Sequence, residues 1–178
     1  MPYSRNDRFQ QTRSRHTRHQ PSKQEFKCIQ CQQYVSCAPL MAGVQNRNHC
    51  PACLWSRHLD WRTAGDRLSG CRAAMQPIAL TTKRSRNKYA RERDGELMLV
   101  HRCTGCAGIV INRIAADDNS AAILEIFDSS TSSDAPALAE LASSDVAILT
   151  LHDRDLVRKC LFGDSHARVQ RSAHALAE

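Results

Sequence analysis

The chain has 178 residues, of which 25 are lysine or arginine and 18 are aspartate or glutamate, so its formal net charge is +7. No stretch is long and apolar enough to cross a membrane, and the N-terminal residues lack the apolar segment of a secretion signal, so we expect a cytoplasmic protein. Nine cysteines in a reducing compartment favour metal ligands over a framework of disulfide bridges.

Positive charge is concentrated in the first two thirds of the chain. Residues 1–120 contain 20 basic and 9 acidic residues, whereas residues 121–178 contain 5 and 9. All but one of the cysteines lie in the basic part. A basic region stapled by metal ions indicates a polyanionic partner, because binding to phosphates releases their counterions.

The first segment, residues 1–24, contains almost no large apolar side chains and one acidic residue. We expect a basic arm without fixed structure when free, because it cannot bury enough apolar surface to offset its ordering entropy. Such arms follow phosphate backbones and become ordered on binding, although a solvated tail without function is the alternative. The residues expected to contact nucleic acid here are Arg5, Arg8, Arg13, Arg15 and Arg18.

Three Cys-x-x-Cys pairs follow, beginning at Cys28, Cys50 and Cys103. Two thiolates at this spacing bind one face of a tetrahedral metal ion, and two such pairs complete a closed zinc site. The first two pairs are separated by 18 residues, which is within the usual range for such sites. Thiolates also accept iron, so the sequence does not distinguish the two metals. The predicted ligands of the first site are Cys28, Cys31, Cys50 and Cys53.

A second metal site would use the third pair and Cys71, and it needs a fourth ligand. The candidates are His49, His58 and His101. On a strand entering the knuckle His101 would crowd it, and His49 is held beside the first site. We prefer His58, on a short helix predicted over residues 54–59, because a ligand there would tie the two sites together. The preferred set is His58, Cys71, Cys103 and Cys106, with His49 and His101 as alternatives.

Alternating apolar residues predict strands over 75–82, 97–102 and 107–114. The segment between the first two has six basic residues and a tyrosine, and we expect a hairpin whose tip contacts a phosphate backbone while the tyrosine stacks on a base. A solvated hairpin tip is the alternative. The predicted contacts from this segment are Lys83, Arg84, Arg86, Lys88, Tyr89 and Arg91, joined by Arg47 and Arg113 beside the knuckles.

The remaining residues predict a small helical extension. Its expected elements are a helical face over 121–127, a helix over 136–142, a short apolar segment over 146–149, a capping box from Thr150 to Asp153, and a helix that reaches Phe162 and ends at Gly163.

The pentapeptide Arg47-Asn48-His49-Cys50-Pro51 resembles the one that gives the RNHCP domain family its name. The resemblance covers about residues 25–120 and continues through Gly65-Asp66-Arg67, the later cysteines and Asp117-Asp118-Asn119. Two positions depart from the pattern: Ala107, where a glycine commonly follows the cysteine pair, and Ala64, where proline tends to precede the glycine. The resemblance implies a zinc-binding domain and does not say what that domain binds.

These observations predict a small α+β protein with zinc-ribbon-like or treble-clef-like β-hairpin knuckles, two metal sites and a C-terminal helical extension. The expected parts are a basic arm over 1–24, an RNHCP-like domain over 25–119, a helical extension over 120–163 and a flexible tail over 164–178. The expected function is RNA binding in association with the ribosome, with ribosomal RNA and ribosomal proteins as partners. No nucleotide-binding glycine-rich motif is present, and no small-molecule substrate is evident.

Two alternative functions are a metal-dependent nuclease and an adaptor whose acidic tail docks a partner protein. The nuclease would use His49 or His58 with Asp117 and Asp118. Against it, both metal sites are expected to be fully ligated by protein, whereas a catalytic zinc keeps one position open for water. The other reading of the acidic residues near Arg67 and at 117–119 is that they form internal salt bridges and turn caps.

Overall fold

A computed structural model of the chain describes residues 25–83, 95–132 and 146–163. Four predictions therefore lie outside the described residues: the arm over 1–24, the tip of the hairpin, the helix over 136–142 and the tail over 164–178. The expected nucleic-acid contacts that fall there are Arg5, Arg8, Arg13, Arg15, Arg18, Arg84, Arg86, Lys88, Tyr89 and Arg91.

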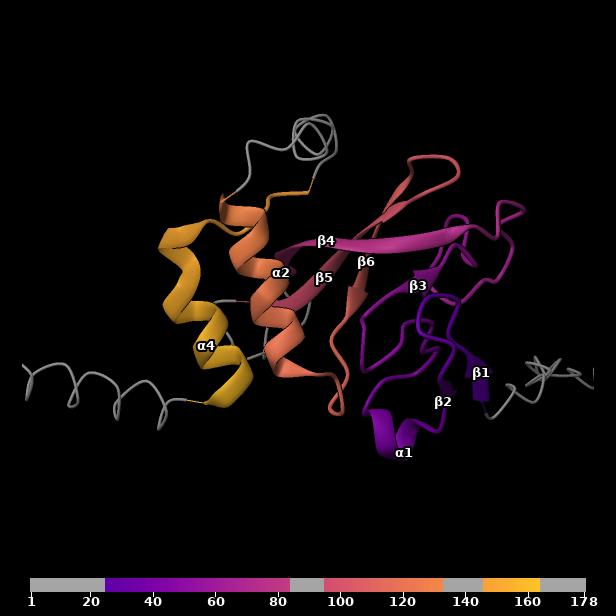
Figure 1. Cartoon of the computed structure of the whole chain (residues 1–178), viewed down its shortest axis with the longest axis horizontal. Helices are drawn as coiled ribbons and strands as arrows, with labels where there is room; N and C mark the ends of the chain where they lie inside the picture. The colour runs from indigo at the N-terminus through magenta and orange to yellow at the C-terminus, as the bar shows by residue number, and fades with distance from the viewer. Residues whose placement is uncertain (1–24, 84–94, 133–145, 164–178) are drawn as a thin grey trace, which may run out of the picture.

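The centre of the molecule is a four-stranded antiparallel sheet in the order β3-β4-β5-β6 (Figure 1). The strands are β3 (Ser56–Arg57), β4 (Ala74–Lys83), β5 (Glu96–Cys103) and β6 (Ile109–Arg113). The three strands predicted from alternating residues are confirmed, each with its ends within two residues of the expected ones. A register shift between Pro77 and Ala79 in β4 fits the proline, which cannot donate a ladder hydrogen bond.

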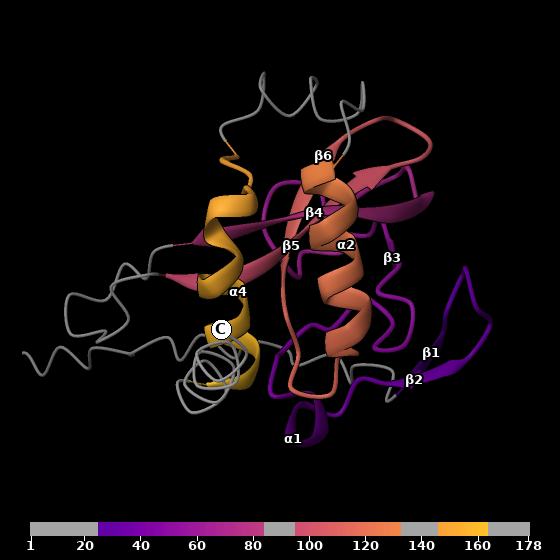
Figure 2. The ribbon, with the colours of Figure 1, turned by 60° about the vertical axis from the view of Figure 1, so that its left-hand side comes forward.

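Two helices cover one face of this sheet. Helices α2 (Ser120–Ser132) and α4 (Arg154–Phe162) lie side by side at one end of the molecule (Figures 1 and 2). Arg154 of α4 donates to Asp128 of α2 at 2.7 Å. Successive residues of β5 alternate between the two faces, which places Leu97 and Leu99 beneath the helices. The core on this face consists of Leu54, Leu80, Leu97, Leu99, Ile123, Phe127, Leu149 and Val157.

The predicted ends of the last helix are confirmed. Thr150 and Asp153 form a reciprocal capping box that opens the 3₁₀ turn η1 (Leu151–Asp153), which leads directly into α4. Gly163 ends α4 with φ of 77°, and its N–H donates to the carbonyl of Lys159 at 2.9 Å. The short apolar segment over 146–149 forms an isolated bridge between Ile148 and Thr81.

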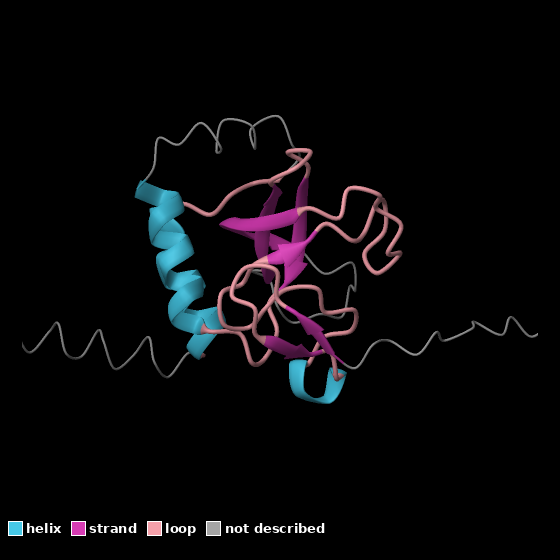
Figure 3. Cartoon of the chain, turned by 45° about the vertical axis from the view of Figure 1, so that its right-hand side comes forward, coloured by secondary structure: helices cyan, strands magenta, loops and turns pink. Residues whose placement is uncertain are grey.

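The N-terminal described residues form a separate small hairpin, β1 (Glu25–Lys27) with β2 (Tyr34–Ser36), followed by the short helix α1 (Pro39–Ala42) (Figure 3). Its apolar cluster is limited to Cys28, Val35 and Cys50, with Phe26 and Cys53 packed against them. A cluster of this size buries little apolar surface, so a bound metal would supply much of the stability of this part.

The short helix predicted over residues 54–59 is wrong. Leu54 has a left-handed backbone with φ of 62°, and the N–H of Cys50 donates to the carbonyl of Trp55 at 2.9 Å, which closes the knuckle. The chain then leaves as strand β3, where Ser56 pairs with Met75. The helical spacing of apolar residues here arises from one buried turn followed by an extended strand.

The architecture is thus a small α+β fold with antiparallel sheets and two cysteine-rich clusters. Within the described ranges no helix is long and apolar enough to span a membrane.

Candidate metal centres

The three Cys-x-x-Cys pairs share one backbone conformation. The residue after each second cysteine, which is Gln32, Leu54 or Ala107, has a left-handed φ between 58° and 63°. Its N–H donates to the carbonyl of the first cysteine, over distances of 3.2 Å to Cys28, 2.8 Å to Cys50 and 3.1 Å to Cys103. The tight turn points both thiols of a pair toward the same point, which is the requirement for a shared metal ion.

The first cluster joins two of these knuckles. The Sγ atoms of Cys28 and Cys53 are 3.6 Å apart, as are those of Cys31 and Cys50, and all four lie within 4.8 Å of one another. Around a tetrahedral zinc with Zn–S bonds of 2.3 Å, sulfur atoms are about 3.8 Å apart. All nine cysteines of the chain are free thiols, so these four remain available as ligands.

The second cluster joins the third knuckle to two residues from elsewhere in the fold. Cys71 and Cys103 have Sγ atoms 3.6 Å apart, and His58 places Nδ1 3.3 Å from Cys106 Sγ. The four ligand atoms lie within 4.8 Å of one another. His58 reaches this position because it follows β3, which runs from the first cluster to the second. The N–H of His58 donates to the carbonyl of Ala73 at 2.9 Å. Both donor sets, Cys₄ and Cys₃His, are those of closed structural zinc sites.

Local hydrogen bonds prepare two of the thiols for metal binding. The backbone N–H of Gln33 is the main cause that lowers the pKa of Cys31 to about 7. Burial acts to raise the pKa of Cys103, but N–H groups of Cys106 and Gly105 and the His58 side chain together lower it to about 6. Burial instead raises the pKa of Cys53. A metal ion would displace the remaining protons, because only thiolates ligate it.

The two clusters differ in exposure. In the first, Cys28 and Cys50 are buried, Cys53 is half-buried and Cys31 is exposed, whereas in the second Cys103 alone is buried and Cys71 and Cys106 are exposed. The first cluster is therefore more deeply buried than the second.

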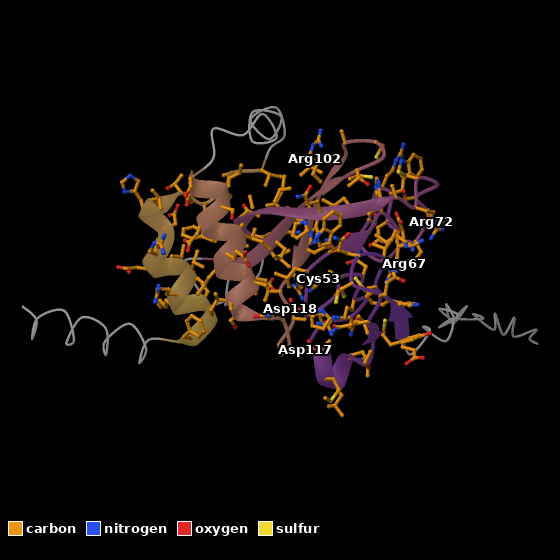
Figure 4. The ribbon with its side chains drawn as sticks, viewed as in Figure 1. Cys53, Arg67, Arg72, Arg102, Asp117 and Asp118 are labelled. Carbon is orange, nitrogen blue, oxygen red and sulfur yellow. The ribbon has the colours of Figure 1, made fainter. Side chains whose placement is uncertain are left out.

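The other histidine beside the first cluster belongs to a buried ionic network. His49 Nε2 lies 2.8 Å from Asp118 Oδ2, and Arg47 donates to Asp118 Oδ1 at 2.9 Å. Arg47 also makes a two-pronged contact with Asp117, at 2.7 and 2.5 Å. The N–H of Ala115 donates to Asp118 at 2.7 Å, so this carboxylate is surrounded by donors. Figure 4 shows Asp117 and Asp118 on the segment that leads from β6 into α2.

Asn119, which follows Asp117 and Asp118, caps the start of α2. Asn119 Oδ1 accepts from the N–H groups of Ala121 and Ala122 at 3.0 and 3.2 Å, and its own N–H donates to the carbonyl of Pro51 at 2.9 Å. The reading of residues 117–119 as internal salt bridges and a turn cap is confirmed. These contacts fix the second knuckle to the start of α2.

His101 is also committed elsewhere. Its Nε2 lies 2.8 Å from the carbonyl of Leu54 and therefore carries the proton, while Nδ1 lies 3.0 Å from Asn112 Nδ2 and accepts. Burial lowers the pKa of His101 to about 4, so the ring is neutral at physiological pH. The structure thus brings His58, and neither His49 nor His101, to the second cluster.

Burial changes the interpretation of two predictions, one for Arg47 and one for the pair of His49 and Asp118. Arg47 was expected to contact nucleic acid, but it is 3% exposed and held by Asp117 and Asp118, so its guanidinium is turned inward. Of the other described candidates, Lys83 is exposed and Arg113 is exposed beside Glu96, 3.2 Å away. The nuclease arrangement of His49 with Asp118 is buried, which leaves this pair without access for a substrate.

The family assignment rests on most of the described chain. The model of the RNHCP domain matches residues 23–124, which is more than half of the protein. The chain belongs to the RNHCP domain family. No curated protein and no solved structure matches it. Three of the five residues in the family's pentapeptide act outside the metal sites: Arg47 and His49 hold Asp118, and Asn48 accepts from Ser56 at 2.9 Å through its carbonyl.

Ala107 departs from the glycine of the RNHCP pattern and has φ of 58°. Because a β-carbon is strained there, Ala107→Gly is expected to raise the free energy of unfolding by about 0.5–1 kcal/mol, after allowance for the entropy that glycine adds to the unfolded chain. Urea unfolding in excess zinc would measure it. Ala52→Gly, inside a knuckle but without a left-handed φ, is the control and should lower the free energy of unfolding. A change in the same direction for both variants would contradict the role of strain at Ala107.

Gly65-Asp66-Arg67 belongs to a longer loop of this RNHCP domain, from Asp60 to Leu68, whose hydrogen bonds were not predicted from the sequence. Asp66 accepts from four backbone N–H groups, those of Trp61, Arg62, Thr63 and Leu68, at 2.9–3.0 Å. These bonds, led by that of Thr63, hold the pKa of Asp66 well below its usual range. Asp60 accepts from Gly65 and Arg67 at 2.8 and 3.1 Å. The feature of the sequence that could have predicted this loop is the pair Asp60 and Asp66 on either side of Gly65.

Proposed function

We propose that this RNHCP domain is a zinc-stabilised module that binds RNA and works in association with the ribosome. The observation that carries the proposal is the charge of its exposed surface. Between residues 25 and 119, the described basic residues that are exposed are Lys27, Arg57, Arg62, Arg72, Lys83 and Arg113, whereas the exposed acidic residues are Glu25 and Asp117.

Four acidic residues of this part are held by donors of the protein itself, whereas the basic residues named above face solvent. Asp118 is buried against Arg47, Asp117 is paired with the same guanidinium, and Asp60 and Asp66 accept backbone N–H groups. A surface with this excess of exposed basic residues attracts phosphates. It adds to the basic residues at 1–24 and 84–94, which supply 11 more lysines and arginines.

Zinc would have a structural role in this module. Two closed sites would rigidify the zinc-ribbon-like knuckles and fix the loops that leave them, with Cys28, Cys31, Cys50 and Cys53 around one ion and His58, Cys71, Cys103 and Cys106 around the other. Fixed loops lose little entropy when their basic residues meet a phosphate backbone.

The proposal predicts binding to RNA that weakens steeply with salt. For about five phosphates contacted on a single strand, the affinity should fall roughly 100-fold between 50 and 200 mM KCl. Fluorescence anisotropy of the zinc-loaded full chain with a labelled RNA would measure this slope. A slope near zero, or no binding at 50 mM KCl, would contradict the proposal.

The ribosomal partner is tested separately by sedimenting a lysate of the source cells on a gradient at low salt. Co-migration with a ribosomal subunit that is lost after nuclease treatment supports association through RNA. Migration only at the top of the gradient would contradict ribosome association. RNA binding itself would still be decided by the anisotropy measurement.

A further inference from the structure

We propose that the loop from Asp60 to Leu68 is a stacking platform for an unpaired RNA base, with Trp61 as the aromatic surface. This inference rests on the proposed RNA binding and assigns it a contact that distinguishes unpaired from duplex RNA. Four features of the loop support it: its rigidity, the orientation of its charges, the exposure of its tryptophan and its position beside the second metal cluster.

The loop is held in one conformation without an apolar core of its own. Its two aspartates accept six backbone N–H bonds from within the loop. Arg67 anchors it to the start of the pentapeptide by donating to the carbonyls of Arg47 and of the preceding Asn46, at 3.2 Å each. Gly65 fits closely here, because a β-carbon would lie 2.6 Å from Asn46 Nδ2. A loop fixed in this way presents its side chains with little entropy left to lose.

The charges of the loop are sorted by direction. Both carboxylates accept backbone N–H groups of the loop, whose dipoles partly offset their negative charge toward an approaching phosphate. The basic residues of the same stretch, Arg57, Arg62 and Arg72, are exposed. Arg72 donates to the carbonyl of Arg67 at 3.1 Å, which places a cation at the base of the loop. Figure 4 shows Arg67 and Arg72 at the end of the molecule opposite the two helices.

Trp61 provides the surface for a base. It is 62% exposed, and the guanidinium of Arg62 lies over its ring at 4.2 Å from the ring centroid. One face of the indole is therefore supported by a cation, and the exposed remainder of the ring is open to a planar ligand. A base that stacks on Trp61 has its own phosphates within the field of the neighbouring arginines. This combination of aromatic surface and basic surroundings is the one by which proteins hold single strands.

The loop is joined to the second metal cluster by short connections. It begins two residues after His58 and ends three residues before Cys71, and the N–H of Ser69 donates to the carbonyl of Leu59 at 2.9 Å. Both ends of the loop are thus fixed to ligands of one cluster. A zinc ion there would set the position of Trp61 relative to the sheet.

The test compares wild type, Trp61→Ala and Trp61→Phe, each loaded with zinc, in binding to a 12-nucleotide unstructured RNA and to the duplex of the same sequence. Trp61→Ala is expected to weaken binding to the unstructured RNA by about 5- to 150-fold and to leave duplex binding nearly unchanged. Trp61→Phe, which keeps an aromatic face, should retain most of the affinity. Because Trp61 is exposed, neither change should alter zinc content or the circular dichroism spectrum.

The outcomes separate this inference from the proposed function. Salt-dependent RNA binding with equal affinity for wild type and Trp61→Ala would overturn the stacking platform and leave RNA binding in place. A similar loss on single-stranded and duplex RNA would also overturn it, since a general phosphate contact would then explain the effect. Absence of RNA binding by wild type would overturn the proposed function and this inference with it.

Discussion

Replacing Cys50 with serine is expected to abolish metal binding at the first cluster and to unfold the N-terminal hairpin with its knuckles. Cys50 is fully buried and joins a small apolar cluster to the predicted zinc. Structural zinc contributes apparent binding free energies of about 10–16 kcal/mol to small domains, which far exceeds what the apolar contacts of Cys28, Val35 and Cys50 can supply. Zinc content by native mass spectrometry and amide hydrogen exchange would report both effects.

The matched control for this prediction is Cys37→Ser. Cys37 is a half-buried free thiol that belongs to neither cluster, so its replacement should leave two zinc ions bound and the exchange pattern unchanged. Cys106→Ser, at the exposed second cluster, should reduce zinc content while leaving protection around Val35 in place. Two zinc ions retained in Cys50→Ser, with normal protection of the first hairpin, would refute the assignment of the first site.

Replacing Asp118 with alanine is expected to lower the free energy of unfolding by about 3–5 kcal/mol. The reason is that the change removes the shared partner of two buried groups, the guanidinium of Arg47 and the ring of His49. The side chain of Asp118 is fully buried between Arg47 and His49 and also accepts from the N–H of Ala115. Without it, Arg47 keeps only Asp117 and His49 loses its partner. Urea unfolding in excess zinc would measure the loss.

Asp117→Ala provides the comparison, because Asp117 contacts the same guanidinium but its side chain is 39% exposed. We expect a loss of about 1 kcal/mol or less there, since water replaces much of the interaction. Arg47 holds the pKa of Asp117 below its usual range, so this smaller contribution is present near neutral pH and is lost as the pH falls through the folded-state pKa. Equal losses in the two variants would contradict the buried role of Asp118.

Much of the scaffold followed from local patterns. The three long strands, the capping box at Thr150 and the glycine that ends α4 depend on residues close together in the sequence, and each was found where it was expected. The donor groups of both clusters could also be chosen from the sequence, because ligand spacing within a knuckle is fixed by one tight turn. The fourth donor at His58 was a choice among three histidines, and the structure brings His58 to the other three ligands.

The errors arose where distant segments meet. Arg47 looked like a surface cation because nothing in its neighbourhood predicts a partner 70 residues later, yet Asp117 encloses it. The helix expected after Cys53 failed because the pairing of Ser56 with Met75 overrides the local spacing of apolar residues. The Trp61 loop was missed for a different reason: a lone tryptophan in a polar segment predicts neither burial nor exposure until its backbone contacts are known.

The length of β4 sets the minimum length of any ligand that contacts both ends of the sheet. Lys83 lies at one end of β4, while Ala74, whose carbonyl accepts from the N–H of Thr104 beside the second cluster, lies at the other. Ten residues in extended conformation measure about 30 Å. If RNA binds as proposed, a mononucleotide cannot touch both ends. An RNA that engages both together must span several nucleotides laid along the direction of β4.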